Sequence, residues 1–143
     1  MFGPHLTLDL YECNKKKISD KKFIHSILDE LPQFIGMHKI SAPNVFDFQG
    51  NPLGNPTAFD QGGISAFVLI AESHISIHTF VNQGYVSVDI FSCKMFEAKK
   101  AEEYLIKKFE AKGVEKHLIM RGKEFPKDVE KAARVVIKSR GSI

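Results

Sequence analysis

The chain contains only two cysteines, Cys13 and Cys93, in 143 residues. Two cysteines cannot form the multi-bridge framework of small secreted domains, so we expect reduced thiols in a cytoplasmic protein. No hydrophobic run approaches the roughly 20 residues of a membrane-spanning helix, and the N-terminus lacks the basic and apolar regions of a secretory signal. We therefore expect no membrane partner.

An excess of charge of one sign is also missing, since 20 Lys and Arg face 17 Asp and Glu. The longest basic run, Lys15-Lys16-Lys17, is typical of a solvated loop, so we expect no nucleic-acid partner. Internal repeats and low-complexity segments are absent as well. With 43% hydrophobic and 26% charged residues, the sequence predicts one globular domain over residues 1–143.

The most informative stretch is residues 71–93, AESHISIHTFVNQGYVSVDIFSC. Its residues alternate with a period of two on both sides of a short polar segment that ends at Gly84, which predicts a β-hairpin. One face of this hairpin carries valine and isoleucine and suits a core. The other face is costly to bury without partners, because it carries His74, Ser76, His78, Ser87, Asp89 and Cys93.

The register of this hairpin decides what lies beside Cys93. If residues 81–84 form the loop, Cys93 lies opposite Glu72, whereas a two-residue Gln83-Gly84 turn places it opposite His74. Either register puts the thiol beside the Glu72–Ser73 peptide bond. We therefore expect a nucleophilic hydroxyl, an imidazole and a thiol to converge in this short stretch of chain.

The remaining patterns predict an α+β fold, a two-layer α/β sandwich with an antiparallel sheet and helices on one face. The other sheet face is partly polar and needs another partner. Asp20 or Ser19 can cap the first helix, and Pro43 favours an edge position for the second strand. The predicted elements are strands at 6–11, 38–46, 64–70 and 116–121, helices at about 20–36, 95–112 and from Pro126, and a long loop at 49–62.

The segment Glu72-Ser73-His74-Ile75-Ser76-Ile77-His78-Thr79 resembles the self-cleavage motif of the prokaryotic S-adenosylmethionine decarboxylases. The segment ending at Cys93 resembles the stretch that follows this motif in the family. Residues 3–13 and 121–126 resemble its first and last strands, so the similarity covers most of the chain. The resemblance implies a homodimer of cleaved protomers, packed sheet to sheet, with active sites at the interface.

The resemblance also implies a chemistry. Ser73 would attack the Glu72 carbonyl, and elimination would cut the chain into a β chain, residues 1–72, and an α chain, residues 73–143. Residue 73 would become a pyruvoyl cofactor, which forms a Schiff base with S-adenosylmethionine and accepts the electrons released by decarboxylation. The product would be the aminopropyl donor for spermidine synthesis.

Further roles follow from the same resemblance. His78 would be the processing base, Cys93 the proton donor in decarboxylation, and Ser65 an assistant in processing. Phe80 would form one wall of the adenine site, and the other would come from Phe46, Phe48 or Phe59. We interpret His74 as structural and Cys13 as a small buried hydrophobic residue.

One departure keeps other substrates open. The family usually has Pro-Glu after its His-Thr-aromatic motif, and this chain has Val81-Asn82. Asn82 would bind the ribose without a charge-assisted hydrogen bond, which is worth roughly 1.5–3 kcal/mol against about 1 for a neutral one. Arginine or ornithine decarboxylation, or a non-catalytic subunit, are the alternatives.

A metal site is a further alternative on the polar face. His74, His78 and Cys93 are plausible zinc ligands, but no second cysteine or carboxylate completes the set. We therefore expect no metal.

Overall fold

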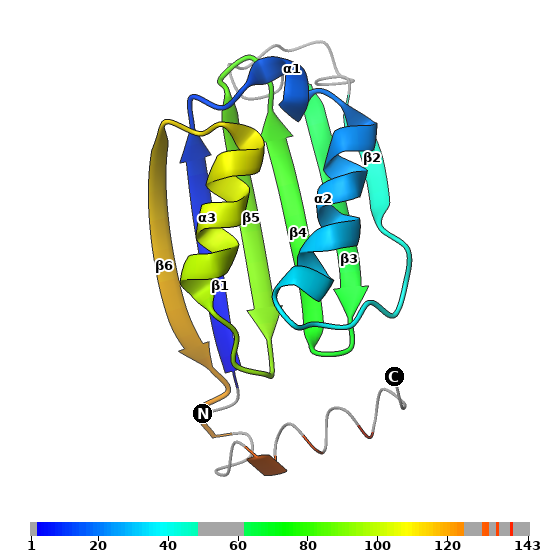
Figure 1. Ribbon diagram of the computed structural model, residues 1–143, viewed down its shortest axis with the longest axis vertical. Coiled ribbons are helices and arrows are strands. Elements are labelled where there is room, and N and C mark those ends of the chain that lie inside the picture. The colour runs from blue at the N-terminus through cyan, green and yellow to red at the C-terminus, as the bar shows by residue number, and fades with distance from the viewer. Residues whose placement is uncertain (1–2, 49–61, 125–129, 132–133, 135–137, 139–143) are drawn as a thin grey trace.

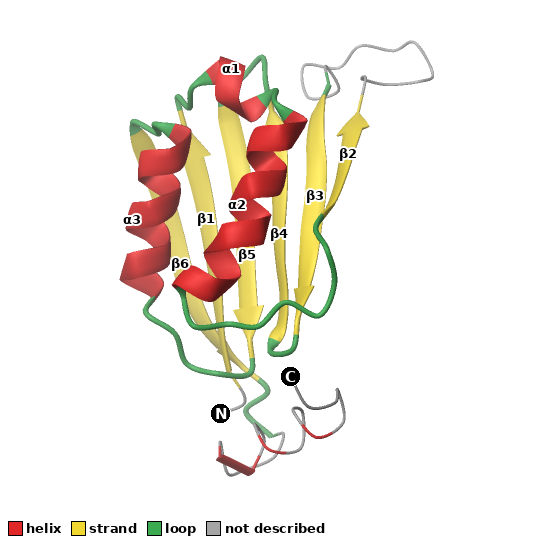
Figure 2. Ribbon diagram, turned by 45° about the vertical axis from the view of Figure 1, so that its right-hand side comes forward, coloured by secondary structure: helices red, strands yellow, loops and turns green. Residues whose placement is uncertain are grey.

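Helices cover one face of a six-stranded antiparallel sheet (Figure 1, Figure 2). The computed structural model describes residues 3–48, 62–124, 130–131, 134 and 138. The strand order is β2-β3-β4-β5-β1-β6, which confirms the predicted sandwich class. The strands are β1 (Gly3–Tyr11), β2 (Asn44–Phe48), β3 (Gly63–Ile70), β4 (Ser73–Phe80), β5 (Tyr85–Ser92) and β6 (Gly113–Arg121). The helices are α1 (Lys15–Ile18), α2 (Lys21–Phe34) and α3 (Ala98–Phe109).

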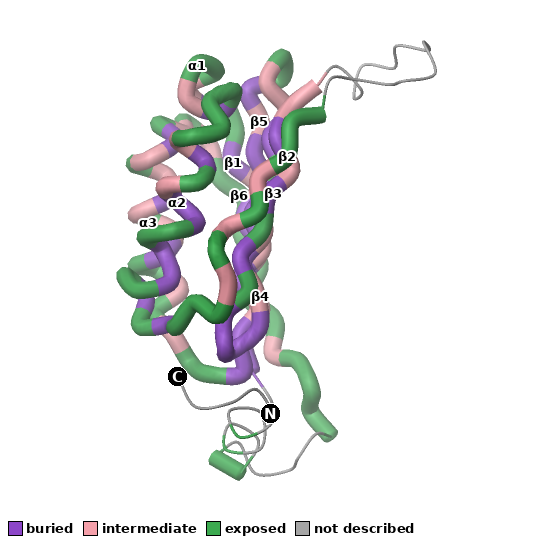
Figure 3. The backbone as a smooth tube through the Cα atoms, turned by 90° about the vertical axis from the view of Figure 1, so that its right-hand side faces the viewer, coloured by how far each residue is buried: buried purple, intermediate pink, exposed green. Residues whose placement is uncertain are grey.

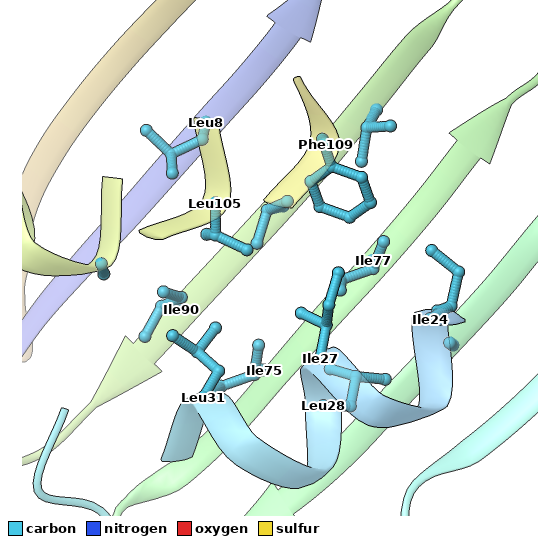
Figure 4. Close-up of a cluster of buried hydrophobic side chains, with 14 of the residues drawn as sticks. Leu8, Ile24, Ile27, Leu28, Leu31, Ile75, Ile77, Ile90, Leu105 and Phe109 are labelled. Carbon is cyan, nitrogen blue, oxygen red and sulfur yellow. The ribbon is translucent and has the colours of Figure 1, made fainter. Parts of the chain in front are cut away.

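The core lies between the sheet and the two longer helices (Figure 4). Alternate residues of the central strands point toward it, and the buried apolar residues of α2 pack against them. Burying one such large aliphatic or aromatic side chain contributes roughly 1.5–3 kcal/mol. The fully buried members include Leu6, Leu8, Leu10, Ile24, Ile27, Leu28, Leu31, Ile75, Ile77, Val86, Ile90, Leu105 and Phe109.

Helix α2 begins and ends largely as its sequence predicts. Of the two candidate caps, Asp20 is the one used, since its carboxylate accepts from the N–H groups of Lys22 and Phe23. Pro32 lies inside the last turn, and the helix continues to Phe34. Gly36 then adopts a φ of +76°, a conformation that favours glycine.

Two predictions are wrong: the loop at Lys15-Lys16-Lys17 and the bounds of the helix over 95–112. The Lys15-Lys16-Lys17 run lies in α1, because Asn14 caps this turn by accepting from the Lys17 N–H. The helix predicted over 95–112 spans Ala98–Phe109, and it ends at Glu110 in the left-handed region rather than at Gly113. Gly113 instead begins β6, which extends the last strand beyond its predicted start.

The second strand is also shorter than predicted. It begins at Asn44, after Pro43, and it forms an edge of the sheet as expected. The preceding segment contacts the sheet through an isolated bridge between Lys39 and Ile70. Most of the predicted loop, residues 49–61 with Phe59, and most of the predicted C-terminal helix lie outside the described residues.

A substitution at Gly63 tests how closely β3 packs against β4. A Cβ atom at this position would lie 1.8 Å from the Thr79 carbonyl oxygen, which is backbone and cannot move aside cheaply. We expect Gly63→Ala to lower the free energy of unfolding by about 1–3 kcal/mol, measured by urea titration. Gly113→Ala is the control, since its Cβ would meet the Tyr11 side chain at 3.4 Å, and an equal loss in both variants would contradict the argument.

Candidate active site

The peptide bond predicted to break lies in a tight, buried turn. Ala71 and Glu72 form the two-residue turn between β3 and β4, and Ile70 pairs with Ser73 across it. Glu72 is 2% and Ser73 8% exposed. Ser73 has a φ of 150°, a region that costs a non-glycine residue about 1–3 kcal/mol. The surrounding contacts therefore hold Ser73 in an unfavourable backbone conformation.

Cys93 is placed beside this turn by the hairpin register. Phe80 pairs with Tyr85, which confirms the four-residue loop and excludes the register with Cys93 opposite His74. The Cys93 N–H donates to the Glu72 carbonyl oxygen at 2.8 Å, and the Cys93 side chain is buried. This donor points at the oxygen that would gain negative charge if a nucleophile attacked the Glu72 carbonyl carbon.

Cys13, by contrast, is far from the turn. Its N–H donates to the Gly84 carbonyl at the opposite end of the hairpin, and the residue belongs to the core. Burial raises the pKa of the Cys13 thiol to about 11, so it stays protonated near neutral pH. These features support its interpretation as a small hydrophobic residue.

His78 and Ser65 form a second cluster. They face each other on β4 and β3, with His78 Nδ1 3.0 Å from Ser65 Oγ. His78 is exposed and lies five residues beyond Ser73 on the same extended strand. At about 3.3 Å per residue the two Cα atoms are roughly 16 Å apart. The predicted convergence of Ser73, His78 and Cys93 is therefore wrong within one protomer.

The candidate adenine-binding residues lie at the His78 end of the sheet. Phe80 packs against Tyr85 with ring centroids 5.3 Å apart, and Asn82 follows in the hairpin loop. Phe48 and Asn82 line one depression, and Phe46 is 58% exposed opposite Ser65. Phe80 lies seven residues, or about 23 Å, from Ser73. The two groups of candidate residues therefore lie at opposite ends of β4 within one protomer.

A separate depression opens beside Ser73. Its walls are largely apolar, and it also contains the guanidinium of Arg121, which lies 4.2 Å from the centroid of the Phe91 ring. The sequence patterns did not predict this placement, which depends on β6 pairing with β1 at the far side of the sheet. The depression is lined by Ile40, Leu69, Ile70, Ser73, His74, Phe91 and Arg121.

Two pairs of polar side chains on the sheet face opposite the helices are hydrogen-bonded, which lowers the cost of their partial burial. His5 Nε2 donates to Asp89 at 2.9 Å, and the Tyr85 hydroxyl donates to Asp9. Burial and the neighbouring Asp9 carboxylate raise the pKa of Tyr85, which keeps it a donor. Among the described residues, no group of three His, Cys, Asp or Glu side chains has the arrangement of a metal site.

The sequence profile of the S-adenosylmethionine decarboxylase family matches residues 4–122. The chain belongs to this family. It is 34% identical over 122 residues to an S-adenosylmethionine decarboxylase proenzyme of Clostridium botulinum, covering 85% of this chain and 95% of that protein. It is 33% identical over 93 residues to the proenzyme of a Synechococcus strain, covering 65% of this chain and 63% of that protein.

A solved structure of the S-adenosylmethionine decarboxylase family has the same fold. The crystal structure of the adenosylmethionine decarboxylase from Aquifex aeolicus superposes with a TM-score of 0.68 at 31% identity. The match covers 85% of this chain and 91% of that chain. In the part of the chain that the structure describes, no helix has both the length and the apolar character needed to cross a membrane.

Proposed function

We propose that this protein cleaves itself between Glu72 and Ser73 and then decarboxylates S-adenosylmethionine, which makes it an adenosylmethionine decarboxylase. The observation that carries the proposal is the strained turn at Ser73, whose preceding carbonyl oxygen accepts from the Cys93 N–H. Membership of the family supports the reaction. The adjacent depression leaves room for a small substrate beside residue 73.

Self-cleavage begins with Ser73. Its Oγ adds to the Glu72 carbonyl carbon, the carbon–nitrogen bond breaks, and an ester replaces the peptide. The Cys93 N–H stabilises the charge on the carbonyl oxygen during this step. A base then removes the Cα proton of residue 73, and the Cβ–Oγ bond breaks. Glu72 leaves as the carboxyl end of the β chain, and hydrolysis of the remaining imine releases ammonia and leaves a pyruvoyl group at residue 73.

The base for this elimination comes from a second copy of the chain. His78, paired with Ser65, is the candidate imidazole, and it lies about 16 Å along the strand from its own Ser73. In Figure 3 the helices lie on one side of the sheet. Phe67 and Leu69 alternate along β3 with residues buried in the core, Phe46 pairs with Ser65 on the same face as these two, and all three are exposed. Exposed apolar patches of this kind mark interaction sites. Two copies packed sheet to sheet in opposite directions would bring His78 of one to Ser73 of the other.

The same packing would complete the substrate site. It would place the aromatic end of one protomer, with Phe80, Asn82 and Phe48, over the Ser73 end of its partner. The pyruvoyl group would bind the substrate amine as a Schiff base and accept the electron pair left by carbon dioxide. Cys93, which is buried and bonded through its N–H to the Glu72 carbonyl, would return a proton to the substrate α-carbon.

The backbone N–H of Cys93 serves self-cleavage and its thiol serves decarboxylation, so a substitution at Cys93 can affect the second reaction without abolishing the first. Cys93→Ala removes the thiol but keeps the backbone N–H, so we expect fragments to form while carbon dioxide release falls about a hundredfold or more. Electrophoresis and release of labelled carbon dioxide measure the two effects. Cys13→Ala is the matched control and should change neither by more than a few-fold; full turnover in Cys93→Ala would contradict the assignment.

The substrate is tested by carbon dioxide release from the purified wild-type protein, with its cleavage followed by electrophoresis. We expect S-adenosylmethionine to be preferred over arginine and ornithine, despite Asn82 in place of the usual acid. Preference for an amino acid would reassign the substrate and keep the cleavage chemistry. Release from none of the three, with an uncut chain, would indicate a non-catalytic subunit. We expect the product to serve spermidine synthesis in the cytoplasm.

A further inference from the structure

The carboxylate of Glu72, the residue before the cleavage site, is held by His38. The His38 ring Nδ1 lies 2.7 Å from Glu72 Oε1, and the His38 backbone N–H donates to Oε2 at 3.2 Å. The Glu72 side chain is 3% exposed, whereas the His38 side chain is 54% exposed. A buried carboxylate is costly unless it is paired and hydrogen-bonded, so His38 makes this position of Glu72 possible.

His38 is itself fixed against the cleavage turn. The Ala71 N–H donates to the His38 carbonyl at 2.8 Å, and the Ile40 N–H donates to the Leu69 carbonyl at 3.0 Å. On the other side of the turn, Lys94 Nζ donates to the Gly36 carbonyl at 3.0 Å. Residues 36–40 are thus anchored to β3 and its turn, just before the scissile bond, and to Lys94, the residue that follows Cys93.

We propose that His38 is a positioning residue for the first step of self-cleavage, the attack of Ser73 on the Glu72 carbonyl. This inference rests on the proposed self-cleavage. Cys93 holds the Glu72 carbonyl oxygen and His38 holds the Glu72 side chain, so this residue is fixed from two directions. The orientation of the Glu72 carbonyl relative to Ser73 Oγ is then fixed, and Ser73 keeps its unfavourable φ. His38 exchanges no proton in this step and acts through Glu72.

The first test compares three variants by timed appearance of fragments from newly synthesised chain. His38→Ala should slow cleavage by about 10- to 100-fold, the kinetic equivalent of losing a hydrogen bond to a charged group. His38→Asn should recover much of the rate, because its amide nitrogen can take the place of Nδ1. His25→Ala, an exposed histidine on α2, should cleave at the wild-type rate.

A double-mutant cycle separates positioning from general destabilisation. Glu72→Gln keeps the shape of the side chain but presents an amide in place of one carboxylate oxygen, and it should slow cleavage as well. If His38 acts through Glu72, combining His38→Ala with Glu72→Gln adds little to the larger single effect. Multiplication of the two effects would overturn the inference, as would wild-type cleavage in His38→Ala.

Hydroxylamine identifies the affected step, since it cleaves esters and not peptide bonds under mild conditions. His38→Ala should yield little hydroxylamine-released β chain, because the ester forms slowly. His78→Ala should yield much more, because its ester forms and then waits for a base. Accumulation of ester in His38→Ala would overturn the assignment to the first step, whereas an uncut wild-type chain would reject the proposed function itself.

Discussion

Ser73→Ala is expected to abolish both self-cleavage and decarboxylation. Without Oγ no ester can form at Glu72, and without elimination no ketone appears at residue 73. The purified variant should remain a single 143-residue chain and release no carbon dioxide above background, a loss of at least the 10⁶-fold typical of enzymatic acceleration. Denaturing electrophoresis and labelled carbon dioxide measure the two outcomes.

Ser26→Ala is the matched control for this loss. Ser26 lies on α2, where its hydroxyl donates to the Phe23 carbonyl, and α2 covers the sheet face that carries the core. This variant should cleave and turn over at the wild-type rate. Turnover by an uncut Ser73→Ala chain would show that the catalyst is something other than a product of residue 73.

The second large effect is rescue between two inactive variants. His78→Ala alone should retain an uncut chain, because a positioned general base contributes about 10²- to 10⁴-fold. When it is expressed together with Ser73→Ala, each mixed dimer contains one complete site, with Ser73 from the first chain and His78 from the second. We expect roughly half of the His78→Ala chains to be cut if the chains pair at random. Tags of different length identify the cut chain by electrophoresis.

The control for rescue replaces the helper by the double variant Ser73→Ala, His78→Ala. This helper forms the same mixed dimers but supplies no imidazole, so the His78→Ala chain should stay intact. If His78 instead served the Ser73 of its own chain, neither helper would restore cleavage. That outcome would contradict the antiparallel sheet-to-sheet arrangement.

The hairpin is the part of the site that could be predicted from the sequence. Alternation over residues 71–93 fixes which residues share a face, and the Gly84 loop leaves two registers. The observed pairing of Phe80 with Tyr85 selects the one that brings Cys93 to Glu72. Local pattern was sufficient here because both strands and their loop are contiguous in the chain.

Distance along a strand and irregular segments were harder to predict. His78 shares a motif with Ser73, and closeness in sequence suggested closeness in space, but an extended strand separates them by about 16 Å. His38 was predicted to begin the second strand, but that strand starts only at Asn44, so no pattern pointed to the contact of His38 with Glu72. Arg121 lines the depression beside Ser73 only because of the order of strands in the sheet. The placements of His38 and Arg121 depend on tertiary contacts that local patterns do not encode, whereas the separation of His78 from Ser73 follows from the strand itself.

The intact mass of the purified wild-type chain tests the central claim most directly. We expect two fragments, residues 1–72 and 73–143, with the second lighter by one ammonia than a chain that starts with serine. A single uncut mass in protein that releases carbon dioxide would contradict this claim, and so would a second fragment that begins with an intact serine.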